Sequence, residues 1–340
     1  MKKYDLNLTI SSSPHAHSSN TTRRVMLDVC IALLPALIAA IWFFGWRSLT
    51  LTLVSVLGCV VSEWAYRKLM KKDSTVGDLS AVVTGILIAF VCPVTLPFWT
   101  ILIADVFAIV LVKQLFGGIG MNIVNPALAA RAFLFSWPSL MSGNWVKAGT
   151  AVSAFSTPAN LDGLTAATPM ASLAAQTLPA ESLLDLFLGK IGGSLGEVSA
   201  AALLLGGAYL VLRRVISLRI PLAYLLSVAA LTVLFPQGGN DRLTWMLCQL
   251  LSGGLMLGAI FMATDYASSP VTPRGQIIYG VGCGVLTVLI RYFGSYPEGV
   301  SYAILIMNCC VFLIEKISQP VKFGYVKPVK APKAEKEAAK

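Results

Sequence analysis

The residues with the clearest chemical potential lie in a short polar stretch, 162–169, which reads Asp-Gly-Leu-Thr-Ala-Ala-Thr-Pro within a largely apolar chain. Asp-Gly favours a turn, and Pro169 disfavours helical geometry at the residue before it, so Thr168 is expected to be extended. The two hydroxyls, of Thr165 and Thr168, are separated only by small side chains. Residue types alone favour an ordinary Asx-type turn with solvated hydroxyls.

A second stretch, 117–127, reads Gly-Gly-Ile-Gly-Met-Asn-Ile-Val-Asn-Pro-Ala. Its glycines allow close backbone approach, and the side-chain amides of Asn122 and Asn125 can hydrogen-bond the polar edge of a ligand. A structural role fits equally well, since Asn125 can cap a helix that Pro126 starts. The stretch is expected to be a helix-linking turn, a ligand contact, or both.

Seven ionisable side chains fall within or beside apolar runs, where a charge is costly and tends to face the protein interior. Those near the ends of a run can pair or reach solvent, whereas Asp28, Asp105 and Arg131 lie farther from the ends. The candidates for an ion path are Asp28, Asp105, Asp265 and Glu315, and the other three residues are Glu63, Arg131 and Arg291. His15 and His17 have no nearby third ligand, so no metal site is predicted, and no set of catalytic residues stands out.

Composition identifies the class of protein that carries these residues. The chain has 340 residues, of which 56% are hydrophobic and only 12% charged, whereas about 25% charged residues is usual for soluble domains. Apolar runs recur along almost the whole chain, which predicts an all-α integral membrane protein with about ten transmembrane helices. The expected spans are 25–46, 49–66, 79–91, 97–115, 126–137, 199–212, 220–235, 245–264, 276–290 and 300–317.

The net charge of +10 is concentrated in segments that flank the runs. Lys and Arg are retained on the cytoplasmic side, so both termini are expected to be cytoplasmic, and nucleic-acid binding is not indicated. The chain then divides into a cytoplasmic segment 1–24, a transmembrane domain 25–317 and a basic cytoplasmic tail 318–340. Within the domain, the long connection 139–198 is expected outside the cytoplasm. The ten helices can form two sets of five related by an inverted repeat.

The stretch 162–168 matches the pattern D-G-x-[ST]-x-A-T, and the chain resembles the RnfD subunits of Rnf complexes, which are homologous to the NqrB subunit of the sodium-pumping NADH:quinone oxidoreductase. Further matching blocks are 117–127, 192–197, 258–265 and 290–300. The resemblance implies that a flavin transferase recognises Asp162, Gly163 and Thr165 and joins FMN through its phosphate to Thr168. It also implies a second, non-covalent flavin, riboflavin, at Asn122 and Asn125.

By the same resemblance, the chain is a redox subunit of an ion-translocating NADH:ferredoxin oxidoreductase in the inner membrane. Its implied partners are the other membrane subunits, the FMN-bearing RnfG subunit and iron–sulfur subunits. An acidic residue at the position of Glu315 is linked to cation uptake in the family, but it is normally Asp, and Phe312 stands where Pro is usual. The alternative is a solute transporter or channel with an inverted repeat, which would have no need of the flavin-attachment pattern.

Overall fold

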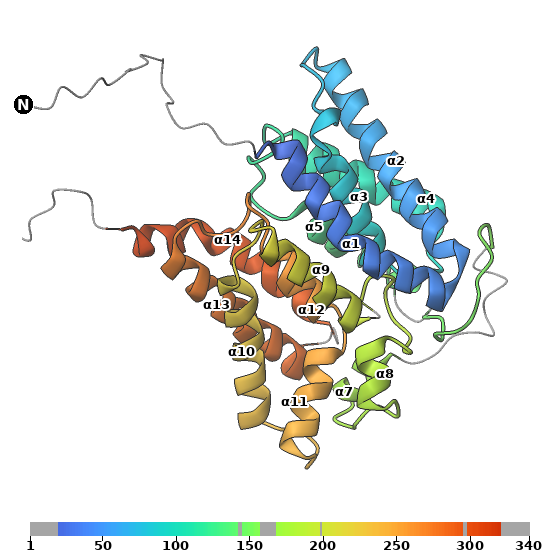
Figure 1. Ribbon diagram of the computed structural model, residues 1–340, viewed down its shortest axis with the longest axis vertical. Helices are drawn as coiled ribbons and strands as arrows, with labels where there is room; N and C mark the ends of the chain where they lie inside the picture. The colour runs from blue at the N-terminus through green and yellow to red at the C-terminus, as the bar shows by residue number, and fades with distance from the viewer. Residues whose placement is uncertain (1–19, 142–144, 157–167, 198, 295–297, 321–340) are drawn as a thin grey trace, which may run out of the picture.

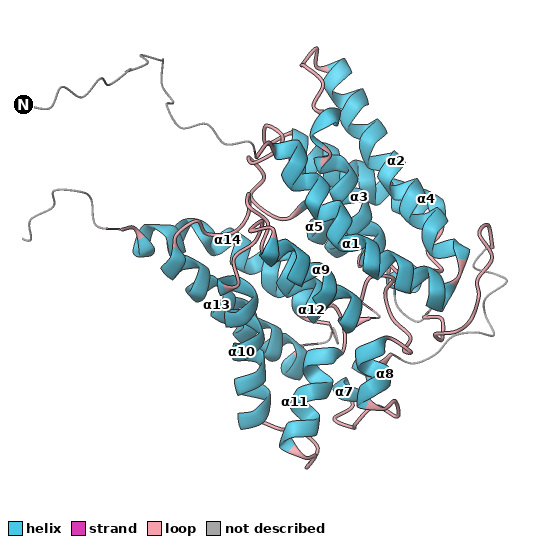
Figure 2. Ribbon diagram, in the orientation of Figure 1, coloured by secondary structure: helices cyan, strands magenta, loops and turns pink. Residues whose placement is uncertain are grey.

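The computed structural model describes residues 20–141, 145–156, 168–197, 199–294 and 298–320, and within these ranges all regular structure is helical (Figure 2). The first part contains α1 (Thr22–Phe44), α2 (Trp46–Leu69), η1 (Val76–Asp78), α3 (Ser80–Phe90), α4 (Phe98–Val106), η2 (Phe107–Gln114) and α5 (Pro126–Leu134). Three short helices follow, α6 (Pro138–Met141), α7 (Pro169–Ala174) and α8 (Leu183–Leu188). The last part contains α9 (Ala200–Leu212), α10 (Arg219–Leu234), α11 (Arg242–Leu251), α12 (Leu255–Leu257), η4 (Gly258–Met262), α13 (Pro273–Phe293) and α14 (Val300–Ser318).

A helical element lies at each of the ten places predicted from the apolar runs, but the eighth prediction, a single helix over 245–264, is wrong. The chain bends there by 65° between α11 and the α12–η4 segment. The cause is local, because Gly253 has a φ of 69°, a left-handed conformation that a helix cannot accommodate. The apolar pattern continues through the bend and therefore does not reveal it.

Four helices, α1, α2, α13 and α14, are long and apolar enough to cross a membrane, and the bent pair α11/α12–η4 can form a fifth span. The helices α3, α9 and α10 are also apolar but shorter. Large apolar side chains cover outward faces, including Trp42 at 84% exposure and Leu205 at 67%. Exposed apolar surface of this extent is suited to lipid, so the chain is a multi-pass membrane protein.

The helices pack as two groups that are successive in the sequence, coloured blue to green and yellow to red in Figure 1. In the first group α2 packs against α3 and α4, and in the second α10 packs against α11 and α13. The groups meet through α1 with α9 and through α5 with α14. This pairing is compatible with two sets of five helices, and the inverted repeat itself stays a prediction.

Residues 149–152 of the long connection after α5 lie at the C-terminal end of α1. Gly149 donates its backbone N–H to the Phe43 carbonyl at 2.9 Å, and Val152 donates to the Phe44 carbonyl at 3.0 Å. Farther along the connection, Leu183–Leu188 form α8, and the Ser182 side chain caps it by accepting from the Asp185 N–H. In Figure 1, α7 and α8 lie beside α11 at the lower edge of the molecule.

Candidate functional site

A cavity of about 370 Å³ lies between the two helix groups, at the end of α1 away from the long connection. Residues of α1, α3, η2, α5, α9 and η4 contribute to its wall. Most of the wall is apolar, and a small number of polar side chains converge on it. The polar or charged residues are Thr22, Ser80, Thr84, Lys113, Asn122, Asn125, Thr264, Asp265 and Tyr266.

The two predicted amide ligands both line this cavity, but their bonding differs. Asn125 caps α5: its Oδ1 accepts from the backbone N–H of Ala127 at 3.0 Å and of Leu128 at 3.4 Å. Its Nδ2 donates to the Met262 carbonyl across the group boundary at 3.3 Å. The predicted capping role of Asn125 is therefore confirmed, and most of its hydrogen-bonding capacity is used within the protein.

Asn122 keeps more capacity for a ligand. Its Nδ2 donates to the Val124 carbonyl at 3.0 Å, which fixes the side chain against its own turn. The amide also hydrogen-bonds the Asp265 carboxyl. A side-chain amide offers two N–H donors and an acceptor oxygen, so the oxygen stays available to a ligand. Asp265 lies on the same wall and closes a turn by accepting from the Ser268 hydroxyl at 2.9 Å.

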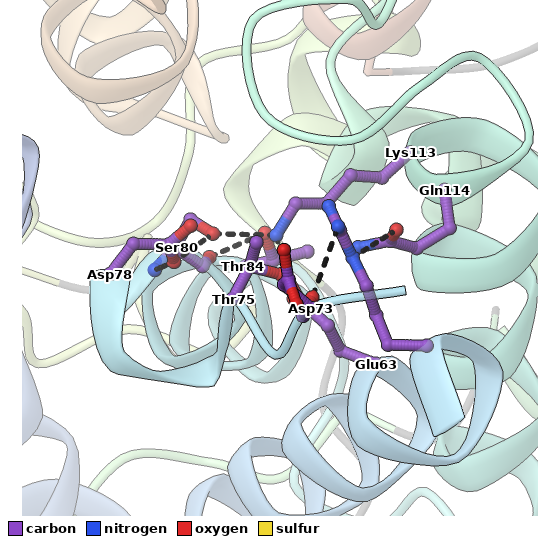
Figure 3. A network of polar contacts seen from close by, with 9 residues as sticks. Glu63, Asp73, Thr75, Asp78, Ser80, Thr84, Lys113 and Gln114 are labelled. Carbon is purple, nitrogen blue, oxygen red and sulfur yellow. Dashed lines mark hydrogen bonds and ion pairs between the residues drawn. The ribbon is translucent and has the colours of Figure 1, made fainter. Parts of the chain in front are cut away.

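Lys113 places a buried positive charge at the cavity wall. Its Nζ donates to Glu63 Oε2 at 2.8 Å and lies 2.5 Å from the Ser80 hydroxyl. Figure 3 shows Lys113 reaching toward Ser80, and the Ser80 hydroxyl in turn donates to Asp78 Oδ1 at 2.6 Å. The Thr75 hydroxyl donates to Glu63 Oε1 at 2.5 Å. Helices α2, α3 and η2 are thus joined by one polar network beside the cavity.

A second ionic network lies toward the other end of the helices. Arg131 Nη1 of α5 donates to Glu197 Oε1 at 2.7 Å, and Arg131 Nη2 pairs with Glu298 Oε2 just before α14. Glu298 Oε1 accepts from the backbone N–H of Gly254 at 2.6 Å, within the bend between α11 and α12. Nearby, Arg291 donates to the Gln249 carbonyl at 2.6 Å. This network joins both helix groups to the bend.

Thr168 is held close to that same bend. It precedes α7 with φ −80° and ψ 152°, the extended conformation predicted from Pro169, and its side chain does not cap the helix. Met170 of α7, two residues after Thr168, packs against Gly253. A Cβ added to this glycine would lie 3.1 Å from Met170 Cγ and 3.3 Å from Arg291 Nη2. Asp162, Gly163, Thr165, His15 and His17 lie outside the described residues.

The four candidate ion-path residues lie in four separate places. Asp28 of α1 accepts from the Tyr209 hydroxyl at 2.9 Å and from Arg213 at 3.3 Å. Asp105 of α4 faces α2, where it contacts the Ser55 hydroxyl, and Asp265 lies at the cavity wall. Glu315 accepts from the backbone N–H of Val271 at 3.1 Å. No single pathway through these four residues is evident from their contacts.

Sequence reasoning missed three residues that the networks depend on, namely Lys113, Glu197 and Glu298. In the sequence Lys113 resembles the charges that set membrane orientation, yet it is 3% exposed. Arg131 could have indicated Glu197 and Glu298, because a guanidinium buried far inside an apolar run is stabilised by pairing with a carboxylate. The sequence does not say which carboxylate, since the partners are 66 and 167 residues away.

Comparison with known proteins places these features in a family. The model of the NQR2, RnfD, RnfE family matches residues 9–324. The chain belongs to this family. It is similar to the D-type subunit of the Na⁺-translocating ferredoxin:NAD⁺ oxidoreductase complex of Acetobacterium woodii, with 49% identity over 97% of this chain and 99% of the relative.

Two more distant members of the family extend the comparison. The D-type subunit of the proton-translocating ferredoxin:NAD⁺ oxidoreductase complex of Clostridium ljungdahlii is 39% identical over 93% of this chain and 96% of its own. The corresponding subunit of the ion-translocating oxidoreductase complex of Actinobacillus succinogenes is 35% identical over 93% and 98%. The predicted family membership is confirmed, and relatives of similar coverage are named for different translocated ions.

Proposed function

We propose that the chain is the flavin-bearing membrane subunit of an ion-translocating ferredoxin:NAD⁺ oxidoreductase. It would carry electrons between FMN joined to Thr168 by a phosphoester and a non-covalent riboflavin in the cavity at Asn122. The observation that carries the proposal is that these two places lie at the two ends of the α12–η4 segment. Met170, two residues after Thr168, packs against Gly253 before this segment, and Asn125 at the cavity donates to the Met262 carbonyl at its end. The eight residues of Leu255–Met262, three in α12 and five in η4, span roughly 12 Å at the rise of an α-helix.

The cavity fits a flavin ring by size and by chemistry. Its volume of about 370 Å³ lies in the range of roughly 300–1,000 Å³ that is typical of small-molecule sites. Its apolar wall suits the faces of a fused aromatic ring, and Asn122 can hydrogen-bond a ring edge. A bound flavin supplies electron-transfer chemistry, and the chain's own residues would position it and tune its potential.

The relatives' names support the wider assignment, since these proteins are the D-type subunits of ferredoxin:NAD⁺ oxidoreductase complexes. We propose the same assembly for this chain, with membrane subunits, an FMN-bearing RnfG subunit and iron–sulfur subunits as partners. A flavin transferase would attach the FMN. In this assembly the protein lies in the inner membrane. The connection 139–198 lies outside the cytoplasm, and both termini lie in the cytoplasm.

Fluorescence of the denatured chain tests the covalent site. After electrophoresis under denaturing conditions, the wild-type band should fluoresce as flavin, and Thr168→Val should abolish the signal. Thr168→Ser is the matched control, because it keeps a hydroxyl at the same position. A wild-type band without flavin would refute the proposal and leave a transporter or channel as the alternative.

Extraction of the native protein tests the non-covalent site. Asn122→Ala should reduce the riboflavin released on denaturation while leaving FMN fluorescence on Thr168 unchanged. Asn240→Ala is a control, since this amide donates to the Gln176 carbonyl in a turn on the far side from the cavity. Unchanged riboflavin content in Asn122→Ala would show that this amide does not hold it.

A further inference from the structure

Asp105 is a buried carboxyl on α4 whose surroundings differ from those of every other acidic side chain described above. Its residue is 0% exposed. Oδ1 lies 2.7 Å from the Ser55 hydroxyl and 3.4 Å from the Cys59 thiol, both on α2. Oδ2 is buried without a hydrogen-bond partner among the described residues, and no described cation forms an ion pair with this carboxyl.

The hydrogens available around Asp105 are too few for an ionised carboxylate. The Ser55 oxygen is within hydrogen-bonding distance of two acceptors, Asp105 Oδ1 at 2.7 Å and the Gly85 carbonyl at 2.9 Å. A hydroxyl carries only one proton. With Asp105 ionised, one of these two short oxygen–oxygen contacts would contain no hydrogen, and a charged oxygen, Oδ2, would be buried without compensation.

A proton on Oδ1 resolves both difficulties. Asp105 Oδ1–H then donates to the Ser55 oxygen, and the Ser55 hydroxyl donates to the Gly85 carbonyl, so each short contact carries a hydrogen. Oδ2 becomes the carbonyl oxygen of a neutral acid, which costs far less to bury than a charge. The Cys59 thiol can still donate weakly to Oδ1.

Oδ2 is buried and packs against α2 at Gly58. A Cβ added to Gly58 would lie 2.5 Å from Oδ2 and 2.8 Å from Leu102 Cδ2, so the carboxyl fills the space that the glycine provides. The ionisable groups nearest to Asp105 are the thiols of Cys59 and Cys92. The charged groups farther away are engaged elsewhere: Lys113 of η2 pairs with Glu63 at 2.8 Å, and Arg131 pairs with Glu197 and Glu298. At the ends of α2, Arg47 donates to the Leu96 carbonyl, Arg67 donates to Gln114, and Lys68 lies over the Trp64 ring. A proton is therefore the ligand that suits this site.

We propose that Asp105 is held as the neutral carboxylic acid and constitutes a proton-binding site within the membrane domain. The site lies on a polar seam along α2 that leads to the Glu63–Lys113 pair at the cavity. The seam consists of the buried residues Ser48, Thr52, Ser55, Cys59 and Glu63. The proposal is independent of the flavins, because it rests only on contacts between α2, α3 and α4.

Infrared spectroscopy of the purified complex, with ¹³C-labelled aspartate in this chain, tests the proposal. The carbonyl stretch of a protonated carboxyl lies apart from carboxylate absorption, and the aspartate label identifies its residue type. At neutral pH we expect an aspartic acid band that Asp105→Asn abolishes. Asn is the near-isosteric replacement, since its Nδ2 can donate to Ser55 as the acid does.

Asp28→Asn is the matched control, because Asp28 is also a buried membrane aspartate but accepts from Tyr209 and Arg213. Its substitution should leave the band intact. Ser55→Ala gives a second readout that survives any folding defect of Asp105→Asn: the band should shift to higher frequency as the acid loses its acceptor. A band that persists in Asp105→Asn, or that does not move in Ser55→Ala, would overturn the proposal.

Discussion

The two buried ionic networks of this protein differ in what surrounds them. The Lys113–Glu63 pair lies at the wall of a cavity, so its cation can act on whatever fills that cavity. The Arg131 network contacts no described cavity, and the two terminal nitrogens of its guanidinium pair with two carboxylates from distant parts of the chain. The same chemistry therefore lines a cavity in one network and joins the two helix groups in the other.

Removing the guanidinium of Arg131 should have the largest effect on folding stability. Arg131→Met leaves Glu197 and Glu298 buried, close together and without their ion-pair partner, and such a loss costs about 3–5 kcal/mol of folding stability. We expect little folded protein in detergent, measured by fluorescence-detected size exclusion. In the control, Glu197→Gln and Glu298→Gln added to Arg131→Met should restore part of it. Wild-type stability of Arg131→Met alone would mean that the network is not structural.

The cavity network should respond in two ways to Lys113→Met. Stability should fall by roughly 3 kcal/mol or less, because Glu63 loses its cation but keeps the Thr75 hydroxyl. If riboflavin occupies the cavity, loss of a nearby positive charge should also lower its midpoint potential, since reduction adds negative charge.

Potentiometry of the non-covalent flavin measures that second effect, with Lys113→Arg as the matched control that keeps the charge. A wild-type protein without this flavin would refute the proposed function. A flavin whose potential is the same in wild type and Lys113→Met would refute only the role of Lys113. Arg131→Met combined with its two glutamine substitutions should leave the potential unchanged, which separates the two networks.

The positions of the helices could be predicted from the sequence because apolar runs and flanking charges report lipid exposure locally. The cap at Asn125 was also predictable, since Asn before Pro126 is a local signal. The bend at Gly253 was not, because the apolar pattern runs through it. Pairs such as Lys113 with Glu63, 50 residues apart, depend on how helices are placed side by side, which no local pattern encodes.

The two amides at the cavity should separate stability from binding. Asn125→Ala removes the cap of α5 and the bond to the Met262 carbonyl, which should cost about 1–2 kcal/mol and lower the melting temperature in detergent. Asn125→Asp separates the two contributions, because a carboxylate can still cap α5 but cannot donate to the Met262 carbonyl. Asn122→Ala should change the melting temperature much less, since this amide caps no helix and bonds only the Val124 carbonyl of its own turn and the Asp265 carboxyl at the cavity wall among the described residues. Equal destabilisation by both substitutions would contradict the difference in their roles.

The smallest effect on stability is expected for the ion pair between Arg213 and Asp28, which is partly exposed and lies away from the cavity. Arg213 pairs with Asp28 at 3.3 Å, but its own side chain is 49% exposed, so water and salt screen the interaction. Arg213→Gln should therefore lower stability by less than about 1 kcal/mol, and Asp28 keeps the Tyr209 hydroxyl as a donor. Melting curves at low and high salt should show the difference between wild type and variant shrinking as salt rises. A loss as large as that of Arg131→Met would mean that exposure does not distinguish the ion pairs of this protein.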